Sequence, residues 1–343
     1  MFERQAPKAD QPKTMLPTDP KNIWMEGIGL IGLGANAKAA SIAGDLVVQN
    51  ARVRAIGEDA GGFRPISEKD LFDCEYWSLE QAKLGKGAPP KFQGKIVMIT
   101  GGSGTIGFAI AKAFSKLGAQ TILVDKDEIA LKECVAKLGV GHKYFPIDVT
   151  HSDAANQAML AAINNFGGLD ILISNAGAAH AGPMLGISNE ELRNAFELNF
   201  FSHYSFSTEA AKILKDQNRG GQILFNISKQ AVNPGKNFGA YGLPKATTFF
   251  LMRQLALELG SDGIRVNGIN ADRIRSGLLT DDFISSRAKS RGVSESEYMA
   301  GNLLNKEVTA EHVADAFTAL ACAESTTGHV MTVDGGNIEA SLR

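Results

Sequence analysis

From about residue 95 onward, short apolar runs alternate with longer amphipathic stretches. The runs at residues 95–100 (KIVMIT), 169–174 (LDILIS) and 221–226 (GQILFN) are apolar at most positions, which is typical of strands covered on both faces. Regular alternation of such strands with helices predicts a parallel sheet with helices on both sides. The predicted fold class is therefore α/β, with a doubly wound parallel sheet.

The individual elements follow from the same periodicity. Strands are predicted at residues 95–100, 121–125, 143–147, 169–174, 221–226, 264–269 and 329–333. Helices are predicted at residues 107–117, 128–138, 155–166, 190–215, 241–259 and 311–321.

Glycine and proline cluster at residues 85–95 (GKGAPPKFQGK), directly before the first of these strands. Such a cluster is typical of a linker. A chain of 343 residues is long enough for one large domain or two smaller ones. We therefore expect an N-terminal extension at residues 1–92 and an α/β domain at residues 93–343.

Composition and charge narrow the class of protein. The hydrophobic share of 44% supports a sizeable core, and the net charge of −2 provides no global field for nucleic acid or an anionic membrane. The chain starts with a polar, proline-rich segment, and no apolar stretch is long enough to span a membrane. Cys74, Cys134 and Cys322 lie far apart, which predicts buried thiols in a reducing compartment. A soluble, cytoplasmic protein is expected.

A glycine-rich segment joins the first strand of the α/β domain to its first helix. Glycines at such a junction let backbone N–H groups approach a pyrophosphate, and the helix N-terminus then faces the negative charge. The predicted cofactor-binding residues of this loop are Thr100, Gly101, Ser103, Gly104, Thr105, Ile106 and Gly107. The alternative is a glycine-rich turn that binds nothing.

Asp125 ends the next strand, eighteen residues after Gly107. A carboxylate at this position binds the hydroxyls of an adenosine ribose and repels a 2′-phosphate, so NAD is favoured over NADP. The adjacent Lys126 opposes this preference, because its ammonium attracts phosphate. The alternative for Asp125 is a side chain that faces solvent.

A second glycine motif, at residues 27–32 (GIGLIG), has the spacing of a dinucleotide-binding loop. The segment before it is short and polar, and no complete strand–helix–strand unit follows. We interpret it as a packed glycine-rich turn.

Ser228, Tyr241 and Lys245 carry the candidate chemistry. A phenol normally keeps its proton up to about pH 10. A lysine one helical turn away lies on the same helix face, where its charge favours the phenolate and lowers the pKa of the tyrosine. A neighbouring hydroxyl can hold a substrate oxygen, so the three groups suit proton transfer at a carbonyl or alcohol. The alternative for Tyr241 is a packed interface residue.

Further motifs occur in a fixed order: SNAG at residues 174–177, ELNFFS around Asn199, IRVNGI at 264–269 and TGHVMTVDGG at 327–336. Together with the glycine loop and the Ser228–Tyr241–Lys245 triplet, they resemble the one-domain short-chain dehydrogenase/reductase family. The resemblance covers residues 93–343 and implies a Rossmann-type fold. It also implies that the cofactor is bound by Asp148, Val149, Asn175, Ala176, Gly177, Tyr241, Lys245, Ile274 and Ser276.

The resemblance implies roles for four catalytic residues. Ser228 would hold the substrate oxygen, and Tyr241 would exchange its proton while hydride moves to or from the nicotinamide. Lys245 would bind the nicotinamide ribose and lower the pKa of the tyrosine. Asn199 would hold a water that relays the proton to solvent.

The chain departs from the family pattern in three places. Thr105 replaces the middle glycine of the loop, and the remaining glycines have the spacing of the family's longer, sugar-nucleotide branch. Asp272 stands where the family has the glycine of a Pro-Gly pair. Pro244 precedes the lysine, so the helix should start close to Tyr241 for the proline to fit in its first turn.

Residues 20–84 resemble the tail of the aldolase half of bifunctional rhamnulose-phosphate aldolase/short-chain dehydrogenases. Such aldolases bind zinc through several histidines, whereas the first histidine of this chain is His142. No metal site is therefore expected in the extension, and aldolase chemistry is predicted to be absent.

Substrate residues are predicted from the segments that border the pocket in this family. The candidates are His180, Lys229, Gln230, Lys236, Arg273 and Arg275, with Asn233 beside them. These polar groups favour a small hydroxylated substrate, including an anionic one. Alternatively, the arginines pair with Asp272, Asp281 or Asp282, and His180 is a loop residue. The segment at residues 277–307 is expected to form a lid.

Three functions are considered. The first is an NAD-dependent dehydrogenase or reductase, and the second is an epimerase or dehydratase that returns the hydride to its substrate. The third is a dehydrogenase-like subunit that docks a separate aldolase. The phenylalanines at 200, 201, 206, 249 and 250 are expected in the core or in a subunit interface, because the helices that carry them form the interface of the family's tetramers. The alternative is that they form an apolar wall of the pocket. A homotetramer or homodimer follows, with no nucleic-acid or membrane partner.

Overall fold

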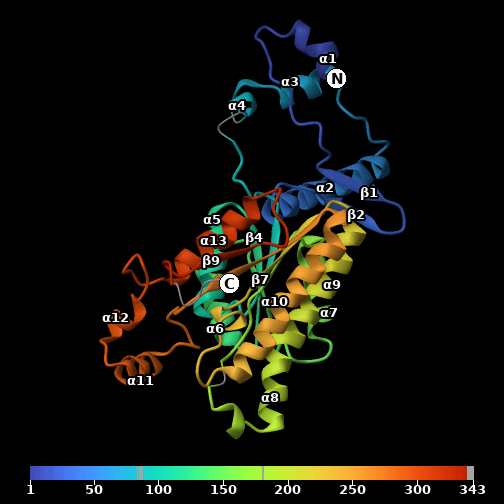
Figure 1. Cartoon of the computed structure of the whole chain (residues 1–343). Helices are drawn as coiled ribbons and strands as arrows, with labels where there is room; N and C mark the ends of the chain where they lie inside the picture. Colours follow the sequence, from blue (N-terminus) through green and yellow to red (C-terminus); the bar gives the residue numbers. More distant parts are fainter. Residues whose placement is uncertain (83, 85–87, 180, 338–343) are drawn as a thin grey trace. The chain divides into compact units, whose positions relative to one another are not determined.

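The computed structural model describes residues 1–82, 84, 88–179 and 181–337. The chain divides into two compact units, Met1–Gln93 and Gly94–Arg343, each with its own secondary structure (Figure 1). The division falls within the glycine- and proline-rich segment at residues 85–95, of which residues 85–87 lie outside the described residues.

The second unit is built on one parallel sheet of seven strands. The strands are β3 (Ile96–Thr100), β4 (Gln120–Asp125), β5 (Lys143–Pro146), β6 (Ile171–Ser174), β7 (Gly221–Asn226), β8 (Ile264–Ala271) and β9 (Val330–Val333). Their order across the sheet is β5-β4-β3-β6-β7-β8-β9, so the direction of winding reverses between β3 and β6. The predicted α/β fold class and all seven predicted strands are confirmed.

Helices cover both faces of this sheet (Figure 1). They are α5 (Thr105–Lys116), α6 (Glu128–Leu138), α7 (Ala154–Phe166), α8 (Asn189–Phe196), α9 (Ser202–Gln217), α10 (Gly239–Leu259), α11 (Asp281–Arg291), α12 (Glu295–Met299) and α13 (Ala310–Cys322). Helices α5, α6 and α13 pack on one face, and α7, α9 and α10 pack on the other. Short 3₁₀ turns lie at Met184–Gly186, Lys229–Ala231 and Gly260–Asp262.

The apolar strands form the centre of the core. Every residue of β3 is buried, and Met98 and Ile122 join a cluster that includes Phe206 of α9 and Met252 of α10. Full burial of such a side chain contributes about 1.5–3 kcal/mol to the free energy of unfolding. Because the core anchors every strand, the loops at the carboxyl ends of the strands start from fixed positions.

The long helix predicted at residues 190–215 is interrupted in the structure. Helix α8 leads into a π turn at Glu197–Phe201, and α9 follows it. One extra residue in such a turn changes the direction of the side chains it carries, and π turns are common at functional sites. Asn199 lies inside this turn.

Helix α10 starts at Gly239, two residues before Tyr241. The prediction that the helix starts close to this tyrosine is confirmed. Pro244 is nevertheless the sixth helical residue, just beyond the first turn, so the carbonyl of Ala240 has no N–H to accept from at position 244.

The first unit consists of short elements and one longer helix, and the short strands pack against that helix (Figure 1). They are α1 (Phe2–Gln5), a 3₁₀ turn (Ala6–Lys8), β1 (Asn22–Met25), β2 (Gly29–Gly32), α2 (Ala37–Asp59), α3 (Glu68–Glu75) and α4 (Ser78–Gln81). Strands β1 and β2 form an antiparallel hairpin, and Gly27 in its turn has a φ of +73°. A side chain at Gly32 would clash with Ala40 of α2. The predicted turn is therefore present, but Gly32, which belongs to β2, is the closely packed glycine of the motif, whereas a side chain at Gly27 or Gly29 would meet nothing within 4 Å.

Cys134 is buried and Cys322 is half-buried, whereas Cys74 is exposed on α3. The expectation of buried thiols is therefore wrong for Cys74, which lies on the outer face of a short helix.

No helix within the described ranges is both long and apolar enough to cross a membrane. Among the same residues, no three His, Cys, Asp or Glu side chains are grouped so that they could hold a metal ion.

Candidate active site

A cavity of about 760 Å³ lies at the carboxyl ends of the strands. Its walls come from the loops that follow β3, β6, β7 and β8, and from the segment that contains α11 and α12. It includes the point between β3 and β6 where the strand order reverses, and ligands of open α/β sheets bind at such points. The fold therefore places the cavity where a dinucleotide would be expected.

The glycine-rich loop forms one wall of this cavity. Gly101, Gly104, Thr105, Ile106 and Gly107 line it, and α5 begins there without a side-chain cap. Gly101 has a φ of +64°, which favours glycine, and a side chain at Gly107 would clash with the carbonyl of Gly101. This loop leaves open N–H groups at a helix N-terminus, which fits the pyrophosphate of a dinucleotide.

Asp125 lines the cavity at the end of β4. Its carboxylate accepts hydrogen bonds from the backbone N–H groups of Ser103, at 3.2 Å, and Lys126, at 2.8 Å. These bonds fix the carboxylate beside the glycine loop. The cavity walls do not include the side chains of Ser103 or Lys126.

The SNAG segment is tied to the loop after β3. The hydroxyl of Thr100 accepts hydrogen bonds from the N–H groups of Asn175, at 2.9 Å, and Ala176, at 3.0 Å. The amide of Asn226, at the end of β7, donates to the side-chain oxygen of Asn175 at 2.9 Å. These hydrogen bonds connect the ends of β3, β6 and β7. Asn175, Ala176 and Gly177 line the cavity, whereas Thr100 is not part of its wall.

Asp148 and Val149 follow β5, and neither is part of the cavity wall. The carboxylate of Asp148 accepts hydrogen bonds from the N–H and hydroxyl of Thr150, which lower its pKa. Ile274 and Ser276, by contrast, lie on the wall, beyond β8.

Ser228, Tyr241 and Lys245 meet at the cavity, as the sequence predicts. Tyr241 lies in the first turn of α10 with only 7% of its surface exposed, and its hydroxyl is hydrogen-bonded to Ser228. Lys245 lies one turn further on, and its ammonium donates to the carbonyl of Asn226 at 3.0 Å. The centre of the Tyr241 ring is 5.9 Å from this ammonium.

The expected direction of the tyrosine pKa is wrong for this structure. Burial raises the pKa of Tyr241 to about 12, and the hydrogen bond to Ser228 offsets only part of this rise. Burial also lowers the pKa of Lys245 to about 7, so near neutral pH this lysine is only partly charged. Desolvation disfavours both charged forms, the phenolate of Tyr241 and the ammonium of Lys245.

Asn199 does not line the cavity. Its amide donates to the carbonyls of Ala178, at 3.0 Å, and Ala195, at 3.1 Å, while its backbone carbonyl accepts from the hydroxyl of Thr248 at 2.7 Å. Asn199 therefore joins the loop after β6 to α8 and α10. Its role as a water-holding residue stays a prediction.

His203 was not predicted, and the structure places it against Lys245. Its ring nitrogens lie 3.3 Å from the lysine ammonium and 2.6 Å from the hydroxyl of Ser174, and only 1% of its surface is exposed. Burial and the charge of Lys245 hold the pKa of His203 well below its ordinary value, so the ring is neutral. A lone histidine within a helix gives no sequence signal for this contact, since it depends on how α9 packs against α10.

The predicted substrate residues divide into two groups. Lys229, Gln230, Lys236 and Arg273 line the cavity, and Asn233 lies beside them. Arg275 is not on the wall, because its guanidinium pairs with Asp281 at 2.5 Å and Glu307 at 2.8 Å. Its prediction as a substrate residue is therefore replaced by the ion-pair alternative. His180 lies outside the described residues.

Residues 277–307 cover one end of the cavity. Leu279, Ile284 and Tyr298 form a small core with Ala288 and Met299, which holds α11 against α12. Phe283, Arg287 and Arg291 of α11 line the cavity, and so does Tyr298. The two arginines were not singled out from the sequence, because their direction depends on how the lid packs.

A family model for short-chain dehydrogenases/reductases, described as enoyl-(acyl carrier protein) reductase, matches residues 102–337. This chain belongs to the short-chain dehydrogenase/reductase family. A second family model, described as the second domain of class II aldolases, matches residues 1–84. This match agrees with the aldolase resemblance expected for the extension.

Solved structures of the family share the fold. L-sorbose reductase from Gluconobacter frateurii, in complex with NADPH and L-sorbose, is 27% identical with a TM-score of 0.67, over 73% of this chain and 98% of that one. A 3-ketoacyl-(acyl-carrier-protein) reductase from Brucella melitensis, in complex with NADH, is 25% identical with a TM-score of 0.63, over 71% of this chain and 98% of that one. The cavity of this chain lies in a fold that binds nicotinamide cofactors in these relatives.

The uncharacterized oxidoreductase YuxG of Bacillus subtilis is 32% identical over 350 residues, which include 98% of this chain. This chain spans about half the length of that relative. The similarity therefore includes both the extension and the short-chain dehydrogenase/reductase unit.

Proposed function

We propose that this protein is an NAD-dependent dehydrogenase or reductase that acts on a small polar secondary alcohol, the matching ketone, or a hydroxyaldehyde. One observation carries the proposal: the hydrogen-bonded Ser228–Tyr241 pair lies at the cavity that the glycine loop also lines. A proton-transfer pair beside a dinucleotide cradle suits hydride exchange at a carbon–oxygen bond.

The residues present fit a nicotinamide dinucleotide. The glycine loop would hold its pyrophosphate, Asp125 its adenosine ribose, and Lys245 its nicotinamide ribose. When bound, the cofactor accepts or supplies the hydride. The carboxylate of Asp125 would accept ribose hydroxyls and repel a 2′-phosphate, which supports the choice of NAD over NADP.

The protein would supply the proton and the position of the substrate. With a pKa of about 12, Tyr241 is protonated at neutral pH and can donate to a carbonyl oxygen held by Ser228. Alcohol oxidation needs the phenolate, which any added positive charge near the ring favours. Lys245 provides such a charge whenever it is protonated.

The test is a screen of NAD reduction by the purified chain over sugars, polyols, hydroxyaldehydes and their phosphates. Steady formation of NADH with at least one of these substrates is expected. An epimerase would convert substrate without net NADH formation, and that result would replace the present proposal. Faster turnover with NADP than with NAD would overturn the assignment of Asp125.

We also propose that residues 93–343 are the NAD-binding unit and that residues 1–92 dock an aldolase. The match of residues 1–84 to class II aldolases supports this proposal. Copurification of a class II aldolase with the full chain, and not with residues 93–343 alone, is the expected result.

A further inference from the structure

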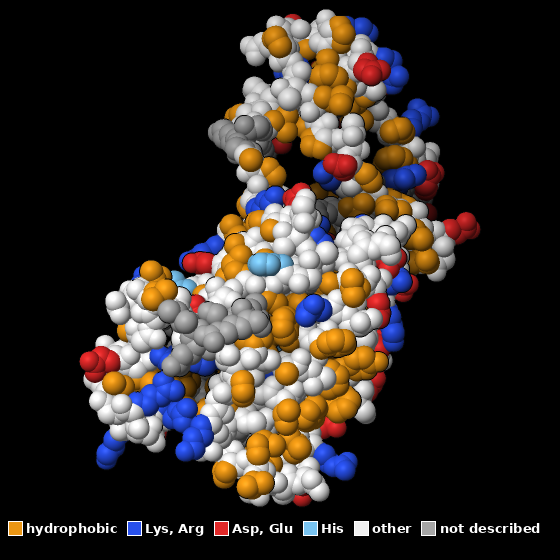
Figure 2. All heavy atoms as spheres, viewed as in Figure 1, with side chains coloured by type: hydrophobic (Ala, Val, Ile, Leu, Met, Phe, Trp, Pro, Cys, Tyr) orange, Lys and Arg blue, Asp and Glu red, His pale blue; other side chains and the backbone are white. Residues whose placement is uncertain are grey.

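The end of the cavity under the lid is rich in positive charge. Figure 2 shows several Lys and Arg side chains together over the region of α11 and α12. The basic residues that line the cavity at this end are Lys229, Lys236, Arg273, Arg287 and Arg291. Asp272 is the acidic residue among the lining residues here, and Asp125 lies at the other end, beside the glycine loop. The basic side chains at this end of the cavity therefore outnumber the acidic ones, and a substrate bound there would meet a net positive charge.

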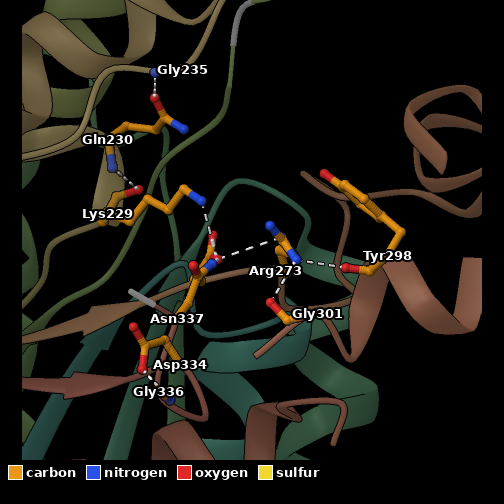
Figure 3. Close-up of polar contacts among 11 residues, drawn as sticks. Lys229, Gln230, Gly235, Arg273, Tyr298, Gly301, Asp334, Gly336 and Asn337 are labelled. Carbon is orange, nitrogen blue, oxygen red and sulfur yellow. Dashed lines mark hydrogen bonds and ion pairs between the residues drawn. The ribbon is translucent and has the colours of Figure 1, made fainter. Parts of the chain in front are cut away.

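Asp272 is already shared by several partners. Its carboxylate lies 3.3 Å from the ammonium of Lys229 and 3.5 Å from Nε of Arg273, and the amide of Asn337 donates to it at 2.6 Å. Figure 3 shows Lys229, Arg273 and Asn337 directed toward the same point. The single negative charge of Asp272 is thus shared by Lys229 and Arg273, and it forms no ion pair with the arginines of α11 among the described residues.

Arg273 is fixed by the backbone of the lid. Its guanidinium donates to the carbonyls of Tyr298, at 2.7 Å, and Gly301, at 3.3 Å, and it lies over the Tyr298 ring (Figure 3). Its backbone has a φ of +53°, a conformation that non-glycine residues seldom adopt. Arg273 therefore joins the lid to the loop after β8.

Arg287 and Arg291 differ from Arg273. They are one turn apart on α11, so both project toward the cavity from the same face. Arg287 packs against the rings of Phe238 and Phe283, which contact each other edge to face, and its Nε is buried without a hydrogen-bond partner among the described residues. Arg291 lies over the Tyr298 ring. No acidic side chain in the described part of the chain forms an ion pair with either one.

One acidic side chain of the neighbouring helix α12 is also engaged. Glu297 accepts hydrogen bonds from the N–H and hydroxyl of Ser294, which cap α12 and lower the pKa of this carboxyl. Arg287 and Arg291 therefore present guanidinium groups to the cavity, and no acidic side chain of the described residues pairs with them. The Nε of Arg287 is itself enclosed, so an anionic ligand in the cavity would be bound by the terminal N–H groups of the two guanidinium groups.

We propose that the substrate carries an anionic group, a phosphate or a carboxylate, and that Arg287 and Arg291 bind this group under the lid. The planar fork of a guanidinium matches both anions. The inference rests on the proposed function, since the opposite end of the substrate would present its hydroxyl or carbonyl to Ser228 and Tyr241. The adjacent rings of Phe238 and Phe283 pack against Arg287 and hold the fork in place before the anion arrives.

Matched pairs of substrates test this inference on the full chain with NAD. Glycerol 3-phosphate is compared with glycerol, glyceraldehyde 3-phosphate with glyceraldehyde, and lactate with propane-1,2-diol. The anionic member of at least one pair should have a kcat/KM at least tenfold above that of its neutral partner. The phosphate pairs and the carboxylate pair then identify which anion is preferred. Equal kcat/KM values within all three pairs would overturn the inference and leave the proposed function standing.

Arg287→Met should reduce the ratio of anionic to neutral kcat/KM about tenfold or more, mainly through KM, and Arg287→Lys should restore part of it. Lys289→Met is the matched control, because Lys289 is on α11, is exposed and does not line the cavity. The control should keep the wild-type ratio. If Arg287→Met and Lys289→Met lower the ratio equally, the effect comes from the net charge of α11, and this result would contradict a specific anion site at Arg287.

If none of these substrates is turned over, the binding of inorganic phosphate tests the anion site. Inorganic phosphate is titrated by calorimetry into the full chain with saturating NAD, which occupies the glycine loop. Binding that weakens about tenfold in Arg287→Met supports the anion site even if the proposed reaction is wrong. Binding of equal strength in wild type and Arg287→Met contradicts the anion site.

Discussion

At the scale of single residues, burial controls the acid–base groups of this site. Tyr241 and Lys245 are each almost fully enclosed, and both neutral forms are favoured. A spacing of four residues on a helix predicts that the two side chains are neighbours, but it carries no information on how much water reaches them. The sequence could therefore identify the pair and not the direction of the tyrosine pKa. The contact of His203 with Lys245 was missed for a similar reason, since it arises from packing between helices.

The pKa of Lys245 predicts a specific dependence of stability on pH. Between pH 7 and 10 the folded protein holds this side chain mostly as the amine, whereas the unfolded chain keeps the ammonium up to its ordinary pKa of 10.5. The unfolded state binds more protons, so raising the pH over this window stabilises the fold, by at most about 1.4 kcal/mol per pH unit for one group. Lys245→Met lacks this contribution.

Urea unfolding of the cofactor-free protein at pH 7.5 and 9.5 measures this effect. Lys245→Met should be more stable than wild type at pH 7.5, and the difference should shrink at pH 9.5. A difference that is the same at both values would mean that the buried lysine keeps its ordinary pKa.

The position of Asp125 predicts the cofactor preference. Asp125→Ser removes the charge that repels a 2′-phosphate and leaves Lys126 beside the site. The ratio of kcat/KM with NAD to kcat/KM with NADP should fall about tenfold or more, equivalent to about 1.4 kcal/mol. Asp127→Ser is the control, because Asp127 caps α6 and does not line the cavity. An unchanged ratio in Asp125→Ser would remove the basis for choosing NAD.

At the scale of elements, strands were easier to predict than helix details. Strands of this sheet are covered on both faces and appear as apolar runs, so β4 and β7 were located within one residue. The π turn at Glu197–Phe201 leaves no comparable trace, because one extra residue shifts the helical repeat at a single point and the apolar stretches on either side still resemble one helix. The lid was expected between residues 277 and 307, but the direction of its arginines follows from its small core.

The glycine loop predicts contrasting effects of two equivalent substitutions. Gly107→Ala would bring a side chain against the carbonyl of Gly101, which belongs to a rigid loop. Gly104→Ala meets the same carbonyl only at 3.4 Å, an ordinary contact. Gly107→Ala should therefore weaken NADH binding about tenfold or more and lower stability, while Gly104→Ala should keep its stability. Fluorescence titration with NADH and thermal unfolding measure both, and equal effects would contradict the described loop.

At the scale of the whole molecule, large apolar side chains at the end of the π turn and on α10 are exposed. Of the phenylalanines expected in the core or an interface, Phe206 is buried in the core, whereas Phe201 and Phe250 are 45% and 68% exposed. Leu257 of α10 is 82% exposed as well. The sequence alone could not tell which of these phenylalanines are buried in the core and which are exposed, since the residue type is the same in both cases. We propose that α9 and α10 form the interface of a homotetramer or homodimer.

Phe250→Asp should dissociate this assembly, because a carboxylate would be buried in an apolar interface. Val140→Asp is the control, as Val140 is exposed in the loop between α6 and β5. Light scattering after gel filtration should show a smaller species for Phe250→Asp and an unchanged one for Val140→Asp. A wild-type protein that is already monomeric would contradict the proposed interface.

Tyr241 is proposed to exchange the proton during hydride transfer. Tyr241→Phe removes the hydroxyl that would carry this proton, and Tyr204→Phe, at an exposed tyrosine of α9, is the control. The measurement is the steady-state rate of NADH formation with the best substrate of the screen. Tyr241→Phe should lower kcat by about 10²–10⁴-fold while the control keeps the wild-type rate. Wild-type turnover in Tyr241→Phe would contradict the account.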